Sequence, residues 1–309
     1  MSVNLAKMLE RCRREQWAVT DFDWTGTPIP LAPEREQEIC AYYVNMSYIE
    51  RLAGALFLSL AKRVDDPTLR AIFETFHADE LRHSHAAARL ADYFDVHHYR
   101  VYTPNVPMLR FIPSFVNLIE SVHPAYATSF ILTGELILDT ALLRSLNAYV
   151  DDPLSRAVVE RINQDESRHL ALDMHMTEHF ARHALGTAAN PWLDPNWWGV
   201  VTWGPGFFNE VFFRPMQRLD PSQTSMRDVM RRLRRFYDHA SVAANPAVRE
   251  FLAWAAFLES WTGSMVGAVV EDASRRLFGV DFAFVRAASS ARVHAPDRPA
   301  TEAFAAASA

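Results

Sequence analysis

The sequence predicts an all-α protein built around a four-helix bundle. Nearly every long segment of the 309-residue chain has apolar residues at helical spacing, and we find no run with the alternating pattern of a strand. A second observation is an internal repeat. Residues 64–83, VDDPTLRAIFETFHADELRH, return as residues 150–169, VDDPLSRAVVERINQDESRH, with 11 of the 20 positions identical. Asp-Asp-Pro is a helix start signal in both copies, so the repeat predicts two similar helical hairpins.

The first hairpin follows an N-terminal arm, residues 1–33, which is rich in proline near its end. The first helix of this hairpin is predicted over about residues 34–64, where apolar side chains recur on one face. Asp66 is expected to cap the second helix, which begins with a proline and continues over residues 67–94.

The second hairpin follows a proline-bearing connection, residues 95–113. A third helix is predicted over about residues 114–149, kinked or broken at Pro124. The fourth helix starts at the second Asp-Asp-Pro and runs over residues 153–185. Two hairpins joined by one long crossover are the arrangement of ferritin-like bundles, here residues 34–185.

The remaining residues are expected to cover the bundle. Residues 186–285 are predicted to pack on it, starting with an aromatic stretch at 192–213 and continuing as helices over 222–243 and 246–278. The Ala- and Ser-rich end, residues 286–309, is expected to be disordered.

Composition narrows the classes of function. The net charge of −6, with Lys and Arg scattered along the chain, gives no electrostatic footprint for nucleic acid. Two cysteines cannot form a disulfide framework or a cysteine-rich zinc site. The N-terminal segment has no apolar core of a signal peptide, and no apolar run is long enough to span a membrane. We therefore expect a cytoplasmic protein without a nucleic-acid or membrane partner.

The ends of the two repeats predict metal ligands. Residues three apart share a face of a helix, so Glu80 with His83, and Glu166 with His169, can each hold one metal ion. A single Glu-x-x-His is a weak signal, but the longer Asp-Glu-x-Arg-His string occurs twice in matching contexts.

Each of the other two helices should then contribute one glutamate. Glu50 precedes Glu80 by 30 residues, and Glu135 precedes Glu166 by 31. Both have apolar neighbours, where an unpaired carboxylate would be costly to bury. Four carboxylates and two imidazoles suit a pair of iron or manganese ions.

The remaining charged residues of the repeated string are predicted to support these ligands. Asp79 and Asp165 are expected to accept the free ring N–H of a histidine on the neighbouring helix. Arg82 and Arg168 are then expected to pair with these aspartates.

This order of motifs resembles the ferritin-like non-haem di-iron oxygenases, and it is most similar to the p-aminobenzoate N-oxygenase (AurF-type) family. The likeness rests on the two Asp-Glu-x-x-His strings and on the runs GELILDTALLRSL and INQDESRH, within residues 34–185. It implies a monooxygenase whose two iron ions activate dioxygen to oxidise an amine. A Mn/Fe pair in place of two iron ions stays open. It carries the ligand role over to six positions: Glu50, Glu80, His83, Glu135, Glu166 and His169.

The sequence departs from that family at one position. The extra histidine ligand of the N-oxygenases falls here on Ile162, and Phe76 occupies the matching place in the first half. His77 and Asp173 are in other registers, so six ligands are expected. Such a set is equally similar to acyl-carrier-protein desaturases and to bacterioferritin. Acyl desaturation or hydroxylation and iron oxidation or storage therefore stay open beside N-oxygenation. The expected partners are a small-molecule substrate, a reductase or ferredoxin-like electron donor and a second copy in a homodimer.

Overall fold

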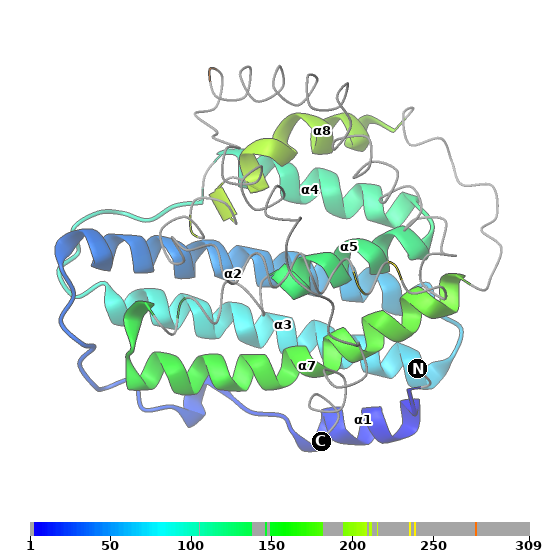
Figure 1. Cartoon of the computed structure of the whole chain (residues 1–309), viewed down its shortest axis with the longest axis horizontal. Helices are drawn as coiled ribbons and strands as arrows, with labels where there is room; N and C mark the ends of the chain where they lie inside the picture. Colours follow the sequence, from blue (N-terminus) through cyan, green and yellow to red (C-terminus); the bar gives the residue numbers. More distant parts are fainter. Residues whose placement is uncertain are drawn as a thin grey trace, which may run out of the picture.

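A computed structural model describes residues 3–104, 106–137, 146, 149–181, 194–208, 210, 211, 215, 235, 238 and 276. The regular structure of these residues is helical, which confirms the predicted all-α class. The bundle consists of α2 (Pro33–Ala61), α3 (Pro67–Phe94), α5 (Pro124–Ile137) and α7 (Pro153–Ala181). Helix α2 packs against α3 and α5, and α7 packs against α5 and α3 (Figure 1).

The two Asp-Pro steps begin α3 and α7 as predicted. Asp66 Oδ1 accepts hydrogen bonds from two amides in the first turn of α3, at 2.7 and 3.0 Å. Asp152 Oδ1 accepts one from the backbone N–H of Ser155, at 2.9 Å. Each carboxylate satisfies amides that have no partner within the helix, and the proline that follows needs none.

The predicted third helix is in fact two helices. Helix α4 (Val106–Ser121) ends shortly before Pro124, where α5 begins. Residues 106–113, expected in the connection, form the first half of α4, so that boundary is wrong. The prolines of this stretch misled the prediction. Pro107 lies in the first turn, where a missing N–H has no consequence, and Pro113 removes only one internal hydrogen bond.

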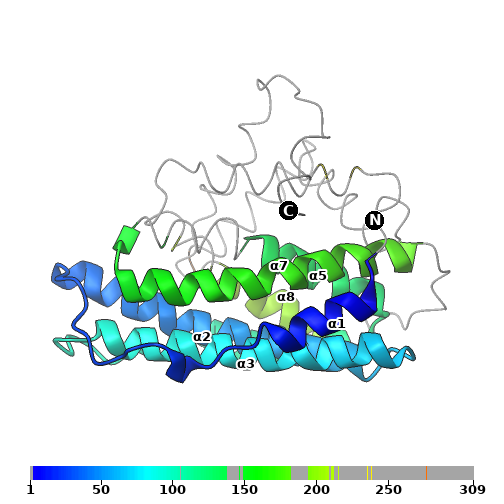
Figure 2. The same cartoon turned by 90° about the horizontal axis from the view of Figure 1, so that it is seen from below.

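Helices outside the bundle lie on opposite sides of it. Helix α8 (Pro195–Phe208), from the predicted aromatic stretch, packs on α4, where Phe207 stacks on Phe111 at 4.2 Å between ring centroids. The N-terminal arm contains α1 (Leu5–Arg14) and a 3₁₀ turn (Val19–Asp21), which contact α3 on the far side from α8 (Figures 1 and 2). The helices predicted over 222–243 and 246–278 and the tail 286–309 lie outside the described residues, isolated positions excepted.

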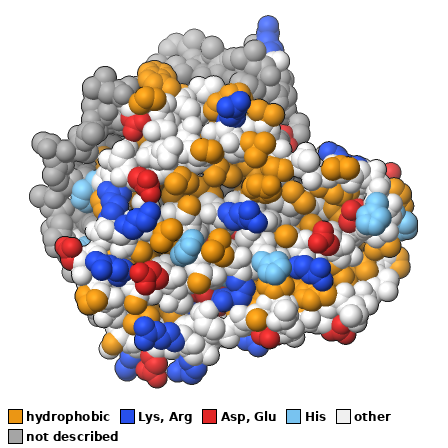
Figure 3. All heavy atoms as spheres, turned by 180° about the vertical axis from the view of Figure 1, so that it is seen from behind, with side chains coloured by type: hydrophobic (Ala, Val, Ile, Leu, Met, Phe, Trp, Pro, Cys, Tyr) orange, Lys and Arg blue, Asp and Glu red, His pale blue; other side chains and the backbone are white. Residues whose placement is uncertain are grey.

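The surface of the described part mixes residue types. Figure 3 shows acidic, basic and apolar side chains interspersed over one face of the molecule. Among the described helices, none combines the length and apolar character that a membrane crossing requires.

Candidate metal centre

The six residues predicted as ligands meet inside the bundle. They come from four helices, and each residue is at most 4 % exposed. The set consists of Glu50 on α2, Glu80 and His83 on α3, Glu135 on α5, and Glu166 and His169 on α7. Their ligand role is a prediction from the sequence, and what the structure adds is their arrangement.

The six side chains form two overlapping groups of possible ligands. In each group the donor atoms lie within 4.8 Å of one another. The first group is Glu50, Glu80, His83 and Glu166, and the second is Glu80, Glu135, Glu166 and His169. Glu80 and Glu166 belong to both groups, so each can bridge two cations. The cluster can therefore hold two metal ions rather than one.

Several buried polar atoms in the cluster lack a hydrogen-bond partner within the described part of the chain. They include both carboxylate oxygens of Glu80 and of Glu135, and Nδ1 of His83. His83 Nδ1 lies 3.0 Å from Glu166 Oε1, and His169 Nδ1 lies 3.0 Å from Glu80 Oε1. These two pairs of atoms are close but poorly aligned for hydrogen bonds, whereas His169 Nδ1 forms a hydrogen bond with Glu166 Oε2 at 3.0 Å. The ring nitrogens and carboxylate oxygens thus converge on a shared space. Metal cations in that space would satisfy them.

The pKa values of two glutamates in the cluster are shifted in opposite directions. Burial raises the pKa of Glu50 well above its usual range, and the charges of Glu80 and Glu166 raise it further. Burial would also raise the pKa of Glu80, but contacts with His169 and His83 outweigh it and lower that pKa to about 2. The metal-free cluster therefore retains protons that a bound metal ion would displace.

The two aspartates of the repeated string support the histidines in a crossed pattern. His83 on α3 places Nε2 3.0 Å from Oδ2 of Asp165 on α7. His169 on α7 places Nε2 3.5 Å from Oδ2 of Asp79 on α3. Both aspartates are buried. Because each Nε2 faces an aspartate, each Nδ1 is left facing the cluster.

Two arginines balance these aspartates. Arg82 pairs with Asp79, and Arg168 pairs with Asp165, both within one helical turn. Arg168 is only 1 % exposed and also contacts Glu15, 3.1 Å away, just after α1. Each arginine also lies within 3.6 Å of the aspartate on the other helix, so the two aspartate charges are compensated together.

The N-terminal arm adds contacts that sequence reasoning did not predict. Gln16 Nε2 donates to Asp79 Oδ1 at 3.0 Å, and Trp17 Nε1 donates to Asp165 Oδ2 at 2.8 Å. Nothing in the local sequence signals these contacts, because the paired residues are 63 and 148 positions apart.

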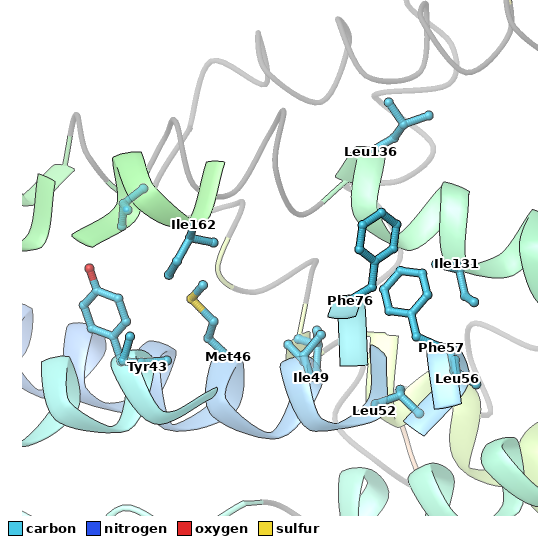
Figure 4. Packing of buried hydrophobic residues seen from close by; sticks show 14 of the residues in the cluster. Tyr43, Met46, Ile49, Leu52, Leu56, Phe57, Phe76, Ile131, Leu136 and Ile162 are labelled. Carbon is cyan, nitrogen blue, oxygen red and sulfur yellow. The ribbon is translucent and has the colours of Figure 1, made fainter. Parts of the chain in front are cut away.

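Aromatic and aliphatic side chains surround the cluster. The ring centroids of Phe57 and Phe76 lie 5.1 and 4.1 Å from the ring centroid of His169. Ile162, at the position of the extra histidine in the N-oxygenases, is fully buried and lies next to Met46 (Figure 4). The position therefore serves core packing in this chain and offers no metal ligand.

One buried carboxylate near the cluster was not predicted to belong to it. Asp173 on α7 is fully buried and interacts directly with Glu135. It follows His169 by four residues and Glu166 by seven, which places all three on one face of the helix. That spacing was the available signal.

Fold and site together define a ferritin-like helical bundle with a buried carboxylate–histidine cluster able to hold two metal ions. Similar solved structures include variants of an R2-like ligand-binding oxidase. A glycine-to-phenylalanine variant with an anaerobically reconstituted Mn/Fe cofactor has a TM-score of 0.54, at 14% identity over 76% of this chain and 92% of its own. A glycine-to-leucine variant with the same cofactor has a TM-score of 0.48, at 16% identity over 81% and 90%. No protein-family model and no curated protein matches the chain. At 14% identity, the likeness to the first of these structures shows the fold alone.

Proposed function

We propose that this protein is a two-metal oxidoreductase that uses dioxygen to oxidise a small organic substrate. The observation that carries the proposal is the pair of ligand groups that share Glu80 and Glu166 inside a closed helical bundle. The fold supports it, because the similar R2-like oxidases are described with a Mn/Fe cofactor.

Two iron ions would be held by the six clustered side chains, with a Mn/Fe pair as the alternative. Carboxylate and imidazole donors suit both metals. When bound, such a pair supplies dioxygen binding and one-electron redox chemistry. The four glutamates would nearly neutralise two divalent ions. Asp79 and Asp165 would hold the histidine rings in the tautomer that presents Nδ1 to the metal.

The surrounding side chains would control access to the centre. Phe57 and Phe76 give it an apolar wall that excludes water from one side. Exclusion of water limits side reactions of an oxidised centre, which an oxidase of organic molecules requires.

The narrower proposal is N-oxygenation of an amine, and it rests on the likeness of the sequence motifs to the N-oxygenases. Electrons would come from a reductase or a ferredoxin-like donor, and the chain would act in the cytoplasm as a homodimer. Acyl desaturation or hydroxylation would use the same centre on a different substrate.

Metal counting tests the centre. The protein is loaded anaerobically with Fe²⁺, desalted and assayed for iron per chain, beside Glu80→Ala and Glu74→Ala. Glu74 is an exposed residue of the same helix and serves as the control. Two irons in the parent and in Glu74→Ala, with loss in Glu80→Ala, is the expected result. Fewer than two irons in the parent, or two in all three proteins, would contradict the proposal.

A second experiment tests the reaction. The iron-loaded parent is exposed to dioxygen with a reductant and a panel of aromatic and aliphatic amines, and products are analysed by mass spectrometry. Oxygen added to an amine supports N-oxygenation, whereas loss of two hydrogens from an acyl substrate supports desaturation. Catalytic oxidation of excess Fe²⁺ without any organic product would instead identify an iron-oxidising protein.

A further inference from the structure

Asp173 is a buried carboxylate beside the predicted metal ligands, and the proposed function gives it no role. The residue is fully buried, and neither carboxylate oxygen has an aligned hydrogen-bond donor within the described residues. It interacts with Glu135, whose two oxygens also lack a donor among the described residues. Two buried carboxylates that face each other without a donor are unfavourable unless a cation or a proton lies between them.

The position of Asp173 on α7 places it beside two predicted ligands. It follows Glu166 by seven residues and His169 by four, so the three side chains share one face of the helix. All three residues are buried, and that face is the one from which α7 contributes to the cluster. Asp173 therefore adds a buried carboxylate next to the group of Glu80, Glu135, Glu166 and His169.

At the other metal position, the described residue that corresponds to Asp173 carries no charge. The repeat aligns positions 86 residues apart, which matches Glu80 with Glu166 and His83 with His169. The residue that corresponds to Asp173 is Ala87, which is fully buried and uncharged. The carboxylates that act on Glu50 are Glu80 and Glu166, which both positions share.

We propose that Asp173 is a fifth carboxylate of the centre and makes its two metal positions unequal. The position bounded by Glu135 and His169 binds a divalent cation more tightly than the position bounded by Glu50 and His83. Attraction between opposite charges is weakly screened in a buried site, and carboxylate oxygen suits Mn²⁺ and Fe²⁺. The inference rests on the proposed two-metal function.

The test is partial loading with Mn²⁺. Crystals of the full chain, loaded with one equivalent per chain, are examined by anomalous scattering to give the occupancy of each position. In the parent, the ion is expected at the Glu135 and His169 position. In Asp173→Asn the affinity of that position is expected to fall roughly tenfold or more, as for other supporting residues of metal sites. The single ion then divides between the two positions.

Controls separate this role from general folding effects. Asp173→Ala is a second variant, and circular dichroism establishes that each variant is folded. Asp152→Asn alters another buried carboxylate, at the start of the same helix, and is expected to leave both occupancies unchanged.

The outcomes distinguish two failures. A parent that fills both positions equally at one equivalent, or a folded Asp173→Asn that keeps the preference, would overturn the inequality and leave the two-metal site standing. A parent that binds no Mn²⁺ and no Fe²⁺ would overturn the proposed function and this inference together.

Discussion

Asp79 and Asp165 show how single residues orient the ligands of this cluster. Each accepts from, or pairs with, the Nε2 of a histidine on the facing helix, and each is held by an arginine one turn further along its own helix. The crossed pattern couples α3 to α7 through four charged or polar side chains. Removal of one aspartate should therefore affect metal binding more than it affects the fold.

Asp165→Asn is predicted to weaken metal binding by about 10- to 100-fold, the usual cost of losing a carboxylate behind a metal-bound histidine. The variant removes the charge that holds His83, while the side chain keeps its volume. Competition with a chromophoric chelator for Fe²⁺ or Mn²⁺ measures the change. Asp66→Asn, which preserves helix capping far from the cluster, serves as the control. Equal affinity of the parent and Asp165→Asn would refute the supporting role.

Arg168→Met is predicted to destabilise the metal-free protein by about 3–5 kcal/mol, because it leaves the buried Asp165 charge without its closest partner. Denaturant unfolding monitored by circular dichroism gives the free energy. Arg161→Met changes an exposed arginine of the same helix and should have little effect. If both variants unfold at the same denaturant concentration, the Arg168 ion pair contributes nothing to stability.

At the scale of helices, the contact between α2 and α3 depends on a glycine. A Cβ added at Gly54 would lie 3.1 Å from Glu80 Cβ and 3.4 Å from His77 Nδ1. A Cβ added at Gly134 on α5 would have no atom within 4 Å. The two glycines therefore differ in packing while both lie within helices near predicted ligands.

Gly54→Ala and Gly134→Ala form a matched pair. Alanine in a helix is favoured over glycine by about 1 kcal/mol, so Gly134→Ala should raise the unfolding free energy by up to that amount. Gly54→Ala should lose this gain, because α3 must shift by a few tenths of an ångström, and its metal affinity should fall as Glu80 moves. Thermal unfolding and chelator competition measure the two effects. Similar metal affinity in both variants would show that α3 accommodates the added methyl group without moving Glu80.

At the scale of the whole molecule, the cluster couples folding to pH. Folding raises the pKa values of Glu50, Glu135 and Asp173, because burial disfavours their charged forms. Burial lowers the pKa values of His83 and His169, but contacts with carboxylates outweigh this and raise them overall. All five groups thus bind protons more tightly in the folded, metal-free protein than in the unfolded chain.

The sign of the stability change follows from this proton binding. A group whose pKa is raised by folding contributes stability below its unfolded pKa and loses it as pH rises through its folded pKa. The stabilising contribution of the three carboxyl groups begins to fall above about pH 4.5, and that of the two histidines begins to fall above about pH 6.5. The lowered pKa of Glu80 changes the stability only below about pH 4.5. The lowered pKa of His123 makes the folded protein more stable as the pH rises, but this single group is outweighed by the five groups with raised pKa values.

The metal-free protein is therefore predicted to become less stable as the pH rises from about 5 to about 8. Saturating Mn²⁺ or Fe²⁺ should reverse the trend, because metal binding competes with these protons and stabilises the folded state by mass action. Thermal unfolding across that pH range, with chelator or with metal, measures both slopes. A metal-free protein that gains stability toward pH 8 would show that these groups do not dominate the linkage.

Much of the fold could be predicted from local signals. Periodicity and the two Asp-Pro caps located α3 over residues 67–94, and α2 and the start of α7 were predicted to within a few residues. The break at Pro124 was also correct. The start of α4 was missed, because prolines in its first half resembled the residues of a connection.

The members of the candidate centre were predictable for a similar reason. Glu-x-x-His on one helix face, repeated in a second hairpin, identifies residues that must face inward together, and the structure clusters all six. The contacts of Trp17 and Gln16 with the aspartates had no such signal. The helical spacing of Asp173 from Glu166 and His169 placed it on the same face, but only the structure brings it to Glu135. These contacts join segments whose separation in the chain says nothing about their distance in space.

The sequence by itself determined the helical class, the paired hairpins and the residues that can act as metal ligands, because helix periodicity and capping depend on neighbours a few positions away. Only the packing of the helices brings Asp165 to His83 and Asp79 to His169. It also places Glu80 and Glu166 in both possible ligand groups and brings Asp173 to Glu135. Those features depend on the rotation and depth at which four helices pack. That packing is set by the fit of buried side chains such as Phe57, Phe76 and Ile162 across the whole bundle.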